Sequence, residues 1–131
     1  MPKEHKEKII VISGAFNPLT TGDLVFLRGA KKLGDWLIVG LHSDEYCKRN
    51  YRTLHRPMRD RANALLAHQY VDEVFRFNDE DNTACYLLRQ IKLIYPYSDI
   101  IFISRKSKKD TPETKISGVR FNFLGDIADK S

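Results

Sequence analysis

The chain has 131 residues, of which 42% are hydrophobic and 30% are charged, and its formal net charge is +5. This length and composition are ordinary for a single soluble globular domain. No apolar run approaches the ~20 residues that a membrane span needs, so no membrane association is expected. The positive charge suits an anionic partner, and on charge alone a nucleotide and a nucleic acid are equally suitable.

The N-terminal residues and the cysteines predict the cellular compartment. Residues 1–7 are charged, lead directly into an apolar run and resemble a flexible tail rather than a signal peptide, which predicts a cytoplasmic protein. Cys47 and Cys85 are the only cysteines, and neither lies in a Cys-x-x-Cys or metal-binding spacing. We therefore expect both to be reduced thiols.

The first part of the chain predicts a strand, a helix and a second strand. Residues 8–12 are rich in β-branched side chains, as in a strand buried on both faces of a parallel sheet. Residues 22–33 carry an amphipathic stripe that ends before Gly34, which is typical of a helix and its stop signal. Residues 35–41 predict the next buried strand, and the connection between the two strands should be right-handed.

The rest of the chain continues the alternation of helices and strands. Pro57 predicts a helix start before the strong helix formers of residues 62–67. A further helix is expected up to about Ile94, with Asn82 or Thr83 as its cap. The other expected segments are strands at 71–77 and 99–104, a basic loop at 105–115 and an edge strand at 119–124. This order predicts an α/β fold with a parallel sheet, in one domain that spans residues 1–131.

Ligands of such sheets bind beyond the carboxyl ends of the strands, where the strand order reverses. The expected ends are residues 13–16, 42–44, 77–79 and 104–106. The first of them, within the segment 13–23, joins a strand to a helix through a glycine-bearing turn. Unpaired N–H groups and the helix dipole favour an anion at such a turn, although one glycine after a strand is a common pattern.

The residues of this turn resemble a known signature. Gly14, Phe16, Asn17, Pro18 and Gly22 match the G-x-F-D/N-P/x-x-H-x-G-H pattern of the cytidylyltransferase-like nucleotidyltransferases. Residues 29–45, 56–61 and 71–74 are similar to further segments of that family, in the same order. The resemblance covers about residues 8–104 and implies a Rossmann-like fold whose parallel sheet is sandwiched by helices.

The resemblance also implies an activity. Its nearest members in pattern are the glycerol-phosphate cytidylyltransferases and the adenylyltransferase domains that activate sugar phosphates. Such enzymes transfer a nucleoside monophosphate from CTP or ATP to a phosphorylated small molecule, with Mg²⁺ and release of pyrophosphate, and they are often homodimers. The nucleotide- and phosphate-binding residues that it implies here are Gly14, Ala15, Phe16, Asn17, Gly22, His42, Arg56, Arg61 and Ser131, and the catalytic ones are Thr20, Asp23 and Lys48.

This chain departs from the signature at its chemistry, because Thr20 and Asp23 stand at the two histidine positions. In one interpretation they form a capping box at the helix start and perform no chemistry. In the other, Thr20 donates a hydrogen bond to phosphate and Asp23 holds Mg²⁺. Loss of both histidines predicts slow or absent turnover with the family's substrates.

The carboxyl end departs as well. Residues 104–107 stand where the family usually has Gly-Gly-Asp after its fourth strand. The family then has a Ser/Thr-rich segment that opens a final helix, and in this chain only Ser131 corresponds to that segment. The alternative function is a non-catalytic nucleotide-binding or scaffolding module. The basic run 105–109 has no interleaved aromatic residues, so we expect a solvated loop rather than a nucleic-acid site.

Overall fold

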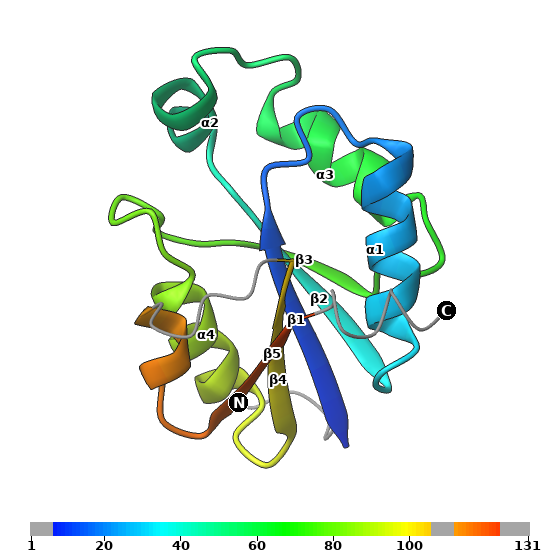
Figure 1. Ribbon diagram of the computed structural model, residues 1–131, viewed down its shortest axis with the longest axis vertical. Helices are drawn as coiled ribbons and strands as arrows, with labels where there is room; N and C mark the ends of the chain where they lie inside the picture. The colour runs from blue at the N-terminus through cyan, green and yellow to red at the C-terminus, as the bar shows by residue number, and fades with distance from the viewer. Residues whose placement is uncertain (1–6, 106–111, 124–131) are drawn as a thin grey trace.

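A computed structural model describes residues 7–105 and 112–123, which form one α/β domain of the Rossmann-like type. Its centre is a parallel five-stranded sheet in the order β3-β2-β1-β4-β5 (Figure 1). The strands are β1 (Lys8–Gly14), β2 (Trp36–Leu41), β3 (Glu73–Arg76), β4 (Asp99–Ser104) and β5 (Val119–Phe123). The predicted fold class is confirmed.

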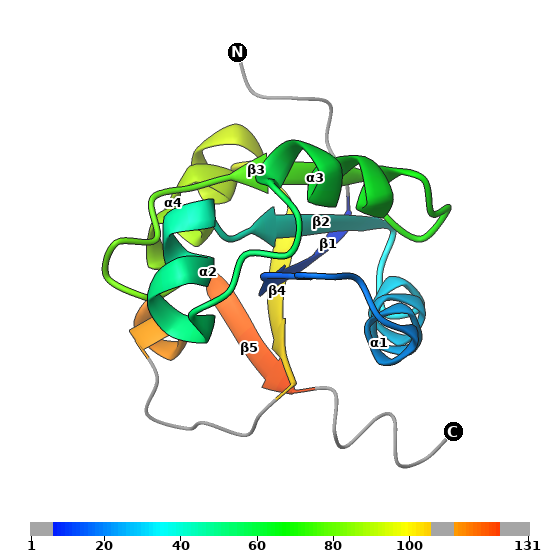
Figure 2. The same ribbon diagram turned by 90° about the horizontal axis from the view of Figure 1, so that it is seen from above.

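Helices cover both faces of this sheet. The helices are α1 (Thr21–Lys31), α2 (Asp44–Tyr51), α3 (Met58–Leu66) and α4 (Cys85–Ile94), and η1 (Pro112–Lys115) is a short 3₁₀ helix. In Figure 1, α1 and α3 lie on one side of the sheet, and α4 and η1 lie on the other. α2 lies next to the arrowhead of β2, at the carboxyl end of the sheet (Figure 2).

Side chains that alternate along β1 build a separate core on each face. Ile10 and Ile12 pack in the cluster with Leu27 of α1 and Leu65 of α3. Ile9 and Val11 pack instead with Leu87, Leu88 and Ile91 of α4. All four β1 side chains are fully buried, and each such burial contributes about 1.5–3 kcal/mol to the free energy of unfolding. The strand buried on both faces is therefore confirmed.

The structure differs from the sequence-based prediction at several element boundaries. α2 was not expected, because it carries no apolar stripe and buries only Cys47; its start is capped by Ser43, whose Oγ accepts the Tyr46 N–H. β3 is shorter than the predicted strand 71–77. The N-cap of α4 is Ala84, not Asn82 or Thr83. β5 does lie at the sheet edge, parallel to β4.

Some predictions lie outside the described residues: the tail up to residue 6, most of the loop 105–115, Leu124 of the edge strand and Ser131.

Cys47 and Cys85 are buried free thiols, as expected. Within residues 7–105 and 112–123, no helix has the length and apolar character to cross a membrane.

The strand order places the functional region. The chain runs outward from β1 through β2 to β3, returns to β4 beside β1 and then continues to β5. The order therefore reverses between β1 and β4, and the carboxyl ends of these two strands frame the crevice where such sheets bind ligands.

We predict that Gly40→Ala lowers the free energy of unfolding by about 1–3 kcal/mol, because overpacking a core displaces its neighbours. A Cβ at position 40 would lie 2.1 Å from Cδ2 of Leu87, which is fully buried. Gly22→Ala is the control, because its Cβ would meet only Thr20 Oγ1 at 3.8 Å. Urea unfolding measures both, and equal midpoints for the two variants would contradict this packing argument.

Candidate functional site

Two adjoining cavities of about 360 and 380 Å³ open at the carboxyl ends of β1 and β4. Both are lined by Ser13, Gly14, Tyr51 and Arg105, so they form one cleft with two compartments. We call them the aromatic compartment, which extends toward β5, and the turn compartment, which follows the chain after β1. The cleft lies where the strand order predicted a ligand.

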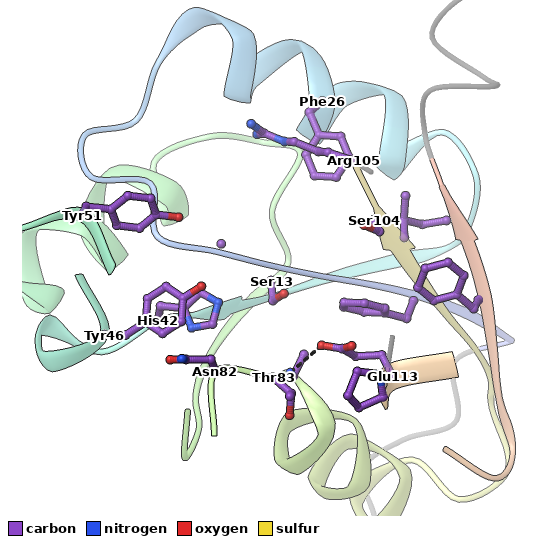
Figure 3. Close-up of a pocket in the computed structure, with 16 residues that line it drawn as sticks. Ser13, Phe26, His42, Tyr46, Tyr51, Asn82, Thr83, Ser104, Arg105 and Glu113 are labelled. Carbon is purple, nitrogen blue, oxygen red and sulfur yellow. Dashed lines mark hydrogen bonds between the residues drawn. The ribbon is translucent and has the colours of Figure 1, made fainter. Parts of the chain in front are cut away.

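The aromatic compartment is lined by both aromatic and polar side chains. Figure 3 shows Arg105 beside Phe26 on one side, His42 and Tyr46 on the opposite side, and Asn82, Thr83 and Glu113 below. The remaining lining residues include Phe102, Ile103 and Phe121. Aromatic side chains next to hydrogen-bonding groups suit a planar ring ligand that carries polar atoms.

The turn compartment is built from the chain that follows β1. Ala15, Phe16, Asn17, Pro18 and Asp23 complete its lining. Phe16 has a positive φ of 48°, and its ring lies so close to Gly14 that a Cβ there would be 2.7 Å from Cε2. Glycine is thus required at position 14 by the neighbouring ring.

Asn17 fixes this turn to a distant loop. Its Oδ1 accepts the N–H groups of His55 (2.7 Å) and Arg56 (3.1 Å), and its Nδ2 donates to the carbonyl oxygen of Thr53 (2.9 Å). All the hydrogen bonds of the Asn17 side chain to described residues therefore hold the backbone of residues 53–56 against the turn.

The start of α1 contains the predicted capping box. Thr20 Oγ1 accepts the Asp23 N–H (3.1 Å), and Asp23 Oδ2 accepts the Thr20 N–H (2.9 Å). The other carboxylate oxygen, Oδ1, pairs with Nη2 of Arg105 at 2.5 Å. The capping interpretation of Thr20 and Asp23 is confirmed as geometry, and their role toward a ligand stays a prediction.

Arg61 is a buried hub rather than an exposed cation. Its Nη1 donates to the carbonyl oxygens of Ala15 (2.8 Å) and His42 (2.9 Å), its Nε donates to that of Arg56 (2.9 Å), and its Nη2 pairs with Asp44 (2.6 Å). The side chain is 0% exposed. Phosphate binding by Arg61 stays a prediction, but this geometry favours a positioning role.

His42 is held by Asp79 at the entrance of α2. Nδ1 of His42 lies 3.0 Å from Asp79 Oδ2, and its ring stacks on Tyr46 with centroids 3.6 Å apart. Burial lowers the pKa of His42 below its usual 6.5, although Asp79 acts in the opposite direction. Burial raises the pKa of Asp79, but hydrogen bonds from Ser43 and His42 outweigh it and leave that pKa lowered. His42 is therefore neutral near pH 7, with Nε2 as an acceptor.

The other predicted residues lie near the cleft without lining it. Gly22 and Thr20 are exposed at the start of α1, and Lys48 is exposed on α2. Arg56 is exposed and lines, with Arg61, a neighbouring cavity of about 510 Å³ between the turn and α3. The structure thus brings together Gly14, Ala15, Phe16, Asn17, Asp23 and His42, and leaves Lys48 and Arg56 at the periphery.

Several cleft residues were not predicted. Arg105 follows β4 directly, so the rule that ligands bind at carboxyl strand ends pointed to its position but not to its contact with Asp23. Asp79, three residues after β3, does not line the cleft but contacts His42, which does. Phe26 and Tyr51 reach the cleft from α1 and α2, and no local pattern marks them.

The described residues offer no cluster of three or more metal-binding side chains. Residues 7–105 and 112–123 contain no group of three or more His, Cys, Asp or Glu side chains that could hold a metal. Both carboxylate oxygens of Asp23 already accept hydrogen bonds. The expectation of Mg²⁺ stays a prediction that rests on the family resemblance.

Comparisons with known proteins match most of the chain. A family model described as cytidylyltransferase-like matches residues 11–122. The chain is 32% identical to "Probable ethanolamine-phosphate cytidylyltransferase" of Encephalitozoon cuniculi, over 95% of this chain and 39% of that protein. It is also 32% identical to an FAD synthase of Pyrococcus abyssi, over 88% of this chain and 80% of that protein.

A solved structure confirms the fold. The lipopolysaccharide core biosynthesis protein of Thermoplasma volcanium superposes with a TM-score of 0.69 over 90% of this chain and 95% of that chain, at 18% sequence identity. At this identity the likeness concerns the fold alone. The chain spans about two fifths of the length of the Encephalitozoon relative, so that protein's activity does not transfer to it directly.

We predict that Arg61→Met lowers the free energy of unfolding by about 3–5 kcal/mol, because it leaves Asp44 and three carbonyl oxygens without their donor. Arg59→Met, at an exposed position of the same helix, is the matched control and should change it by less than about 0.5 kcal/mol. Urea unfolding at pH 7 compares them. A loss for Arg61→Met no larger than that of the control would show that the hub does not stabilise the fold.

We predict that the free energy of unfolding falls as the pH is lowered from 7.5 to 5.5, and falls less in His42→Asn. The folded chain keeps His42 neutral, whereas the unfolded chain takes up a proton near pH 6.5, so acid favours the unfolded state. One proton contributes at most about 1.4 kcal/mol per pH unit. The stabilising ionisation of Asp79 is complete throughout this window, since its pKa is lowered from 3.8. Parallel pH profiles for wild type and variant would contradict the assignment.

Proposed function

This chain belongs to the cytidylyltransferase-like family, and we propose that it binds CTP or ATP in the cleft and transfers the nucleoside monophosphate to a phosphorylated small molecule. The observation that carries the proposal is the two-compartment cleft at the reversal of strand order. Its aromatic compartment suits the nucleoside, and its turn compartment, at the start of α1, suits the phosphates.

The proposed reaction forms a bond between a phosphate oxygen of the acceptor and the α-phosphorus of the nucleotide. The bond from the α-phosphorus to the bridging oxygen breaks, and its electron pair leaves with pyrophosphate. Such transfers depend mainly on positioning and on stabilisation of the charge that spreads over the phosphates. Here the turn that Asn17 and Arg61 hold in place provides the positioning.

Magnesium, when bound, would neutralise phosphate charge. Because Asp23 is engaged on both oxygens, we expect the ion to enter with the triphosphate and not to bind the protein beforehand.

We also propose that the chain forms a homodimer, and this proposal rests on the family resemblance alone.

For the acceptor we propose a phosphorylated alcohol or sugar. One relative is named for ethanolamine phosphate, a small alcohol that carries a phosphate. No described residue distinguishes among these acceptors.

A second candidate function is nucleotide binding without catalysis. The observation that favours it is the capping box, in which Thr20 and Asp23 use their side chains to hold the start of α1. Neither position supplies an imidazole, and loss of one transition-state donor typically reduces the rate by about 10²–10³. In that case the chain would keep its fold and bind the nucleotide in the cleft, but it would not convert the nucleotide to a product.

We predict that one of the four triphosphates CTP, ATP, GTP and UTP raises the thermal unfolding midpoint selectively, because a ligand at ~100 times its Kd adds about 2.7 kcal/mol to the stability of the folded chain. Calorimetry with and without Mg²⁺ then gives its affinity. Release of pyrophosphate on addition of phosphorylated alcohols or sugars separates the enzyme from the non-catalytic module. Absence of binding by all four would contradict both functions.

We also predict that, with nucleotide at a saturating concentration to offset the loss of the Arg105–Asp23 pair, the double variant Thr20→His with Asp23→His increases the rate of pyrophosphate release by about 10²-fold or more, because each imidazole can donate to the charged transition state. The control is Thr20→Ala with Asp23→Asn, which removes the same side chains without adding a donor. Should both double variants turn over at the wild-type rate, the missing histidines would not be what limits this chain.

A further inference from the structure

Arg105 occupies the junction of the two compartments. It is the residue directly after β4, and it lines both the aromatic and the turn compartment. Its side chain is 46% exposed, so the guanidinium is accessible from the cleft. A ligand that extends from one compartment into the other must pass this group.

The guanidinium makes three contacts with described residues. Nη2 donates to Asp23 Oδ1 at 2.5 Å, and the group lies 4.4 Å from the ring centroid of Phe26 and 5.9 Å from that of Phe16. Among the described residues Asp23 is its only hydrogen-bond partner, and this bond uses one of the five guanidinium N–H donors. An ordered guanidinium with further donors at the junction is suited to bind phosphate in a fork geometry.

Asp23 is in turn held by the helix that it caps. Its Oδ2 accepts the Thr20 N–H, which leaves Oδ1 directed at Arg105, and the residue is only 8% exposed. The carboxylate alone would repel phosphate, and the pairing with Arg105 removes that repulsion. The capping box therefore sets the place of the cation as well as the start of α1.

We infer that Arg105 binds the phosphate groups of the nucleotide at the junction of the compartments, with Asp23 as the positioning residue that holds its guanidinium. The inference rests on the proposed function for the identity of the ligand. It assigns to Arg105 the positive charge that neither Thr20 nor Asp23 supplies.

The test is calorimetric binding of inorganic tripolyphosphate in metal-free buffer, followed by binding of the triphosphate that the nucleotide panel selects. Arg105→Gln should weaken both affinities by about 10- to 100-fold, the range for loss of a charge-assisted hydrogen bond. Arg105→Lys should give an intermediate loss, because lysine keeps the charge without the fork. The matched control is Arg89→Gln, on the exposed face of α4, with unchanged affinities.

A double variant separates binding from mere neutralisation of Asp23. If Arg105 binds phosphate, Asp23→Asn with Arg105→Gln remains at least about 10-fold weaker than wild type. Recovery of the wild-type affinity would overturn the inference, because Arg105 would then only mask the carboxylate. Thermal unfolding of each variant verifies that the fold is retained.

The outcomes also distinguish this inference from the proposed function. Equal binding by wild type and Arg105→Gln overturns the inference and leaves the function standing. Arg105-dependent binding of tripolyphosphate without binding of any nucleoside triphosphate supports the phosphate site and overturns the function. Failure of the wild-type chain to bind either probe overturns both.

Discussion

The buried guanidinium of Arg61 is the contact on which the geometry of the cleft depends. It joins the turn after β1, the end of β2, the first residue of α2 and the loop before α3 through hydrogen bonds of 2.6–2.9 Å. These partners lie up to 46 residues from Arg61 in sequence, and their meeting point is the carboxyl edge of the sheet. A cation in a fully buried position persists only when each donor finds a partner, so Arg61 requires these four segments to hold one arrangement.

The start of α1 shows how one pair of side chains serves two purposes. Thr20 and Asp23 satisfy the backbone donors that a helix leaves unpaired, and the second oxygen of Asp23 directs Arg105 into the cleft. A histidine at position 23 would leave Arg105 without its carboxylate. The ion pair between Asp23 and Arg105 therefore links the replacement of the second signature histidine to the position of the cation at the junction.

On the side of the cleft away from Arg105, the wall depends on buried polar side chains. His42 lies at the end of β2, where its ring stacks on Tyr46 and its Nδ1 meets Asp79. Asp79 accepts two further hydrogen bonds from Ser43, which tie the end of β3 to the start of α2. The aromatic compartment thus has a hydrogen-bonded, stacked wall beside β2 and a half-exposed cation beside β4. This asymmetry suits a ligand with a flat ring at one end and negative charge at the other.

The sequence by itself determined the strands, most of the helices, their alternation and the capping box, because these features depend on side-chain periodicity and on contacts within one helical turn. It also located the turn at Gly14–Asn17 as the anion-binding candidate. Only the tertiary structure decided that Arg61 is buried, that Arg105 meets Asp23 and that Asp79 orients His42. Apart from the bond of Arg61 to Arg56, five residues away, these contacts span 17 to 82 residues of sequence, and no local pattern records them. α2 was missed for a related reason: it is polar along most of its length, and its place depends on Ser43 and on packing beyond the strand ends rather than on an apolar stripe.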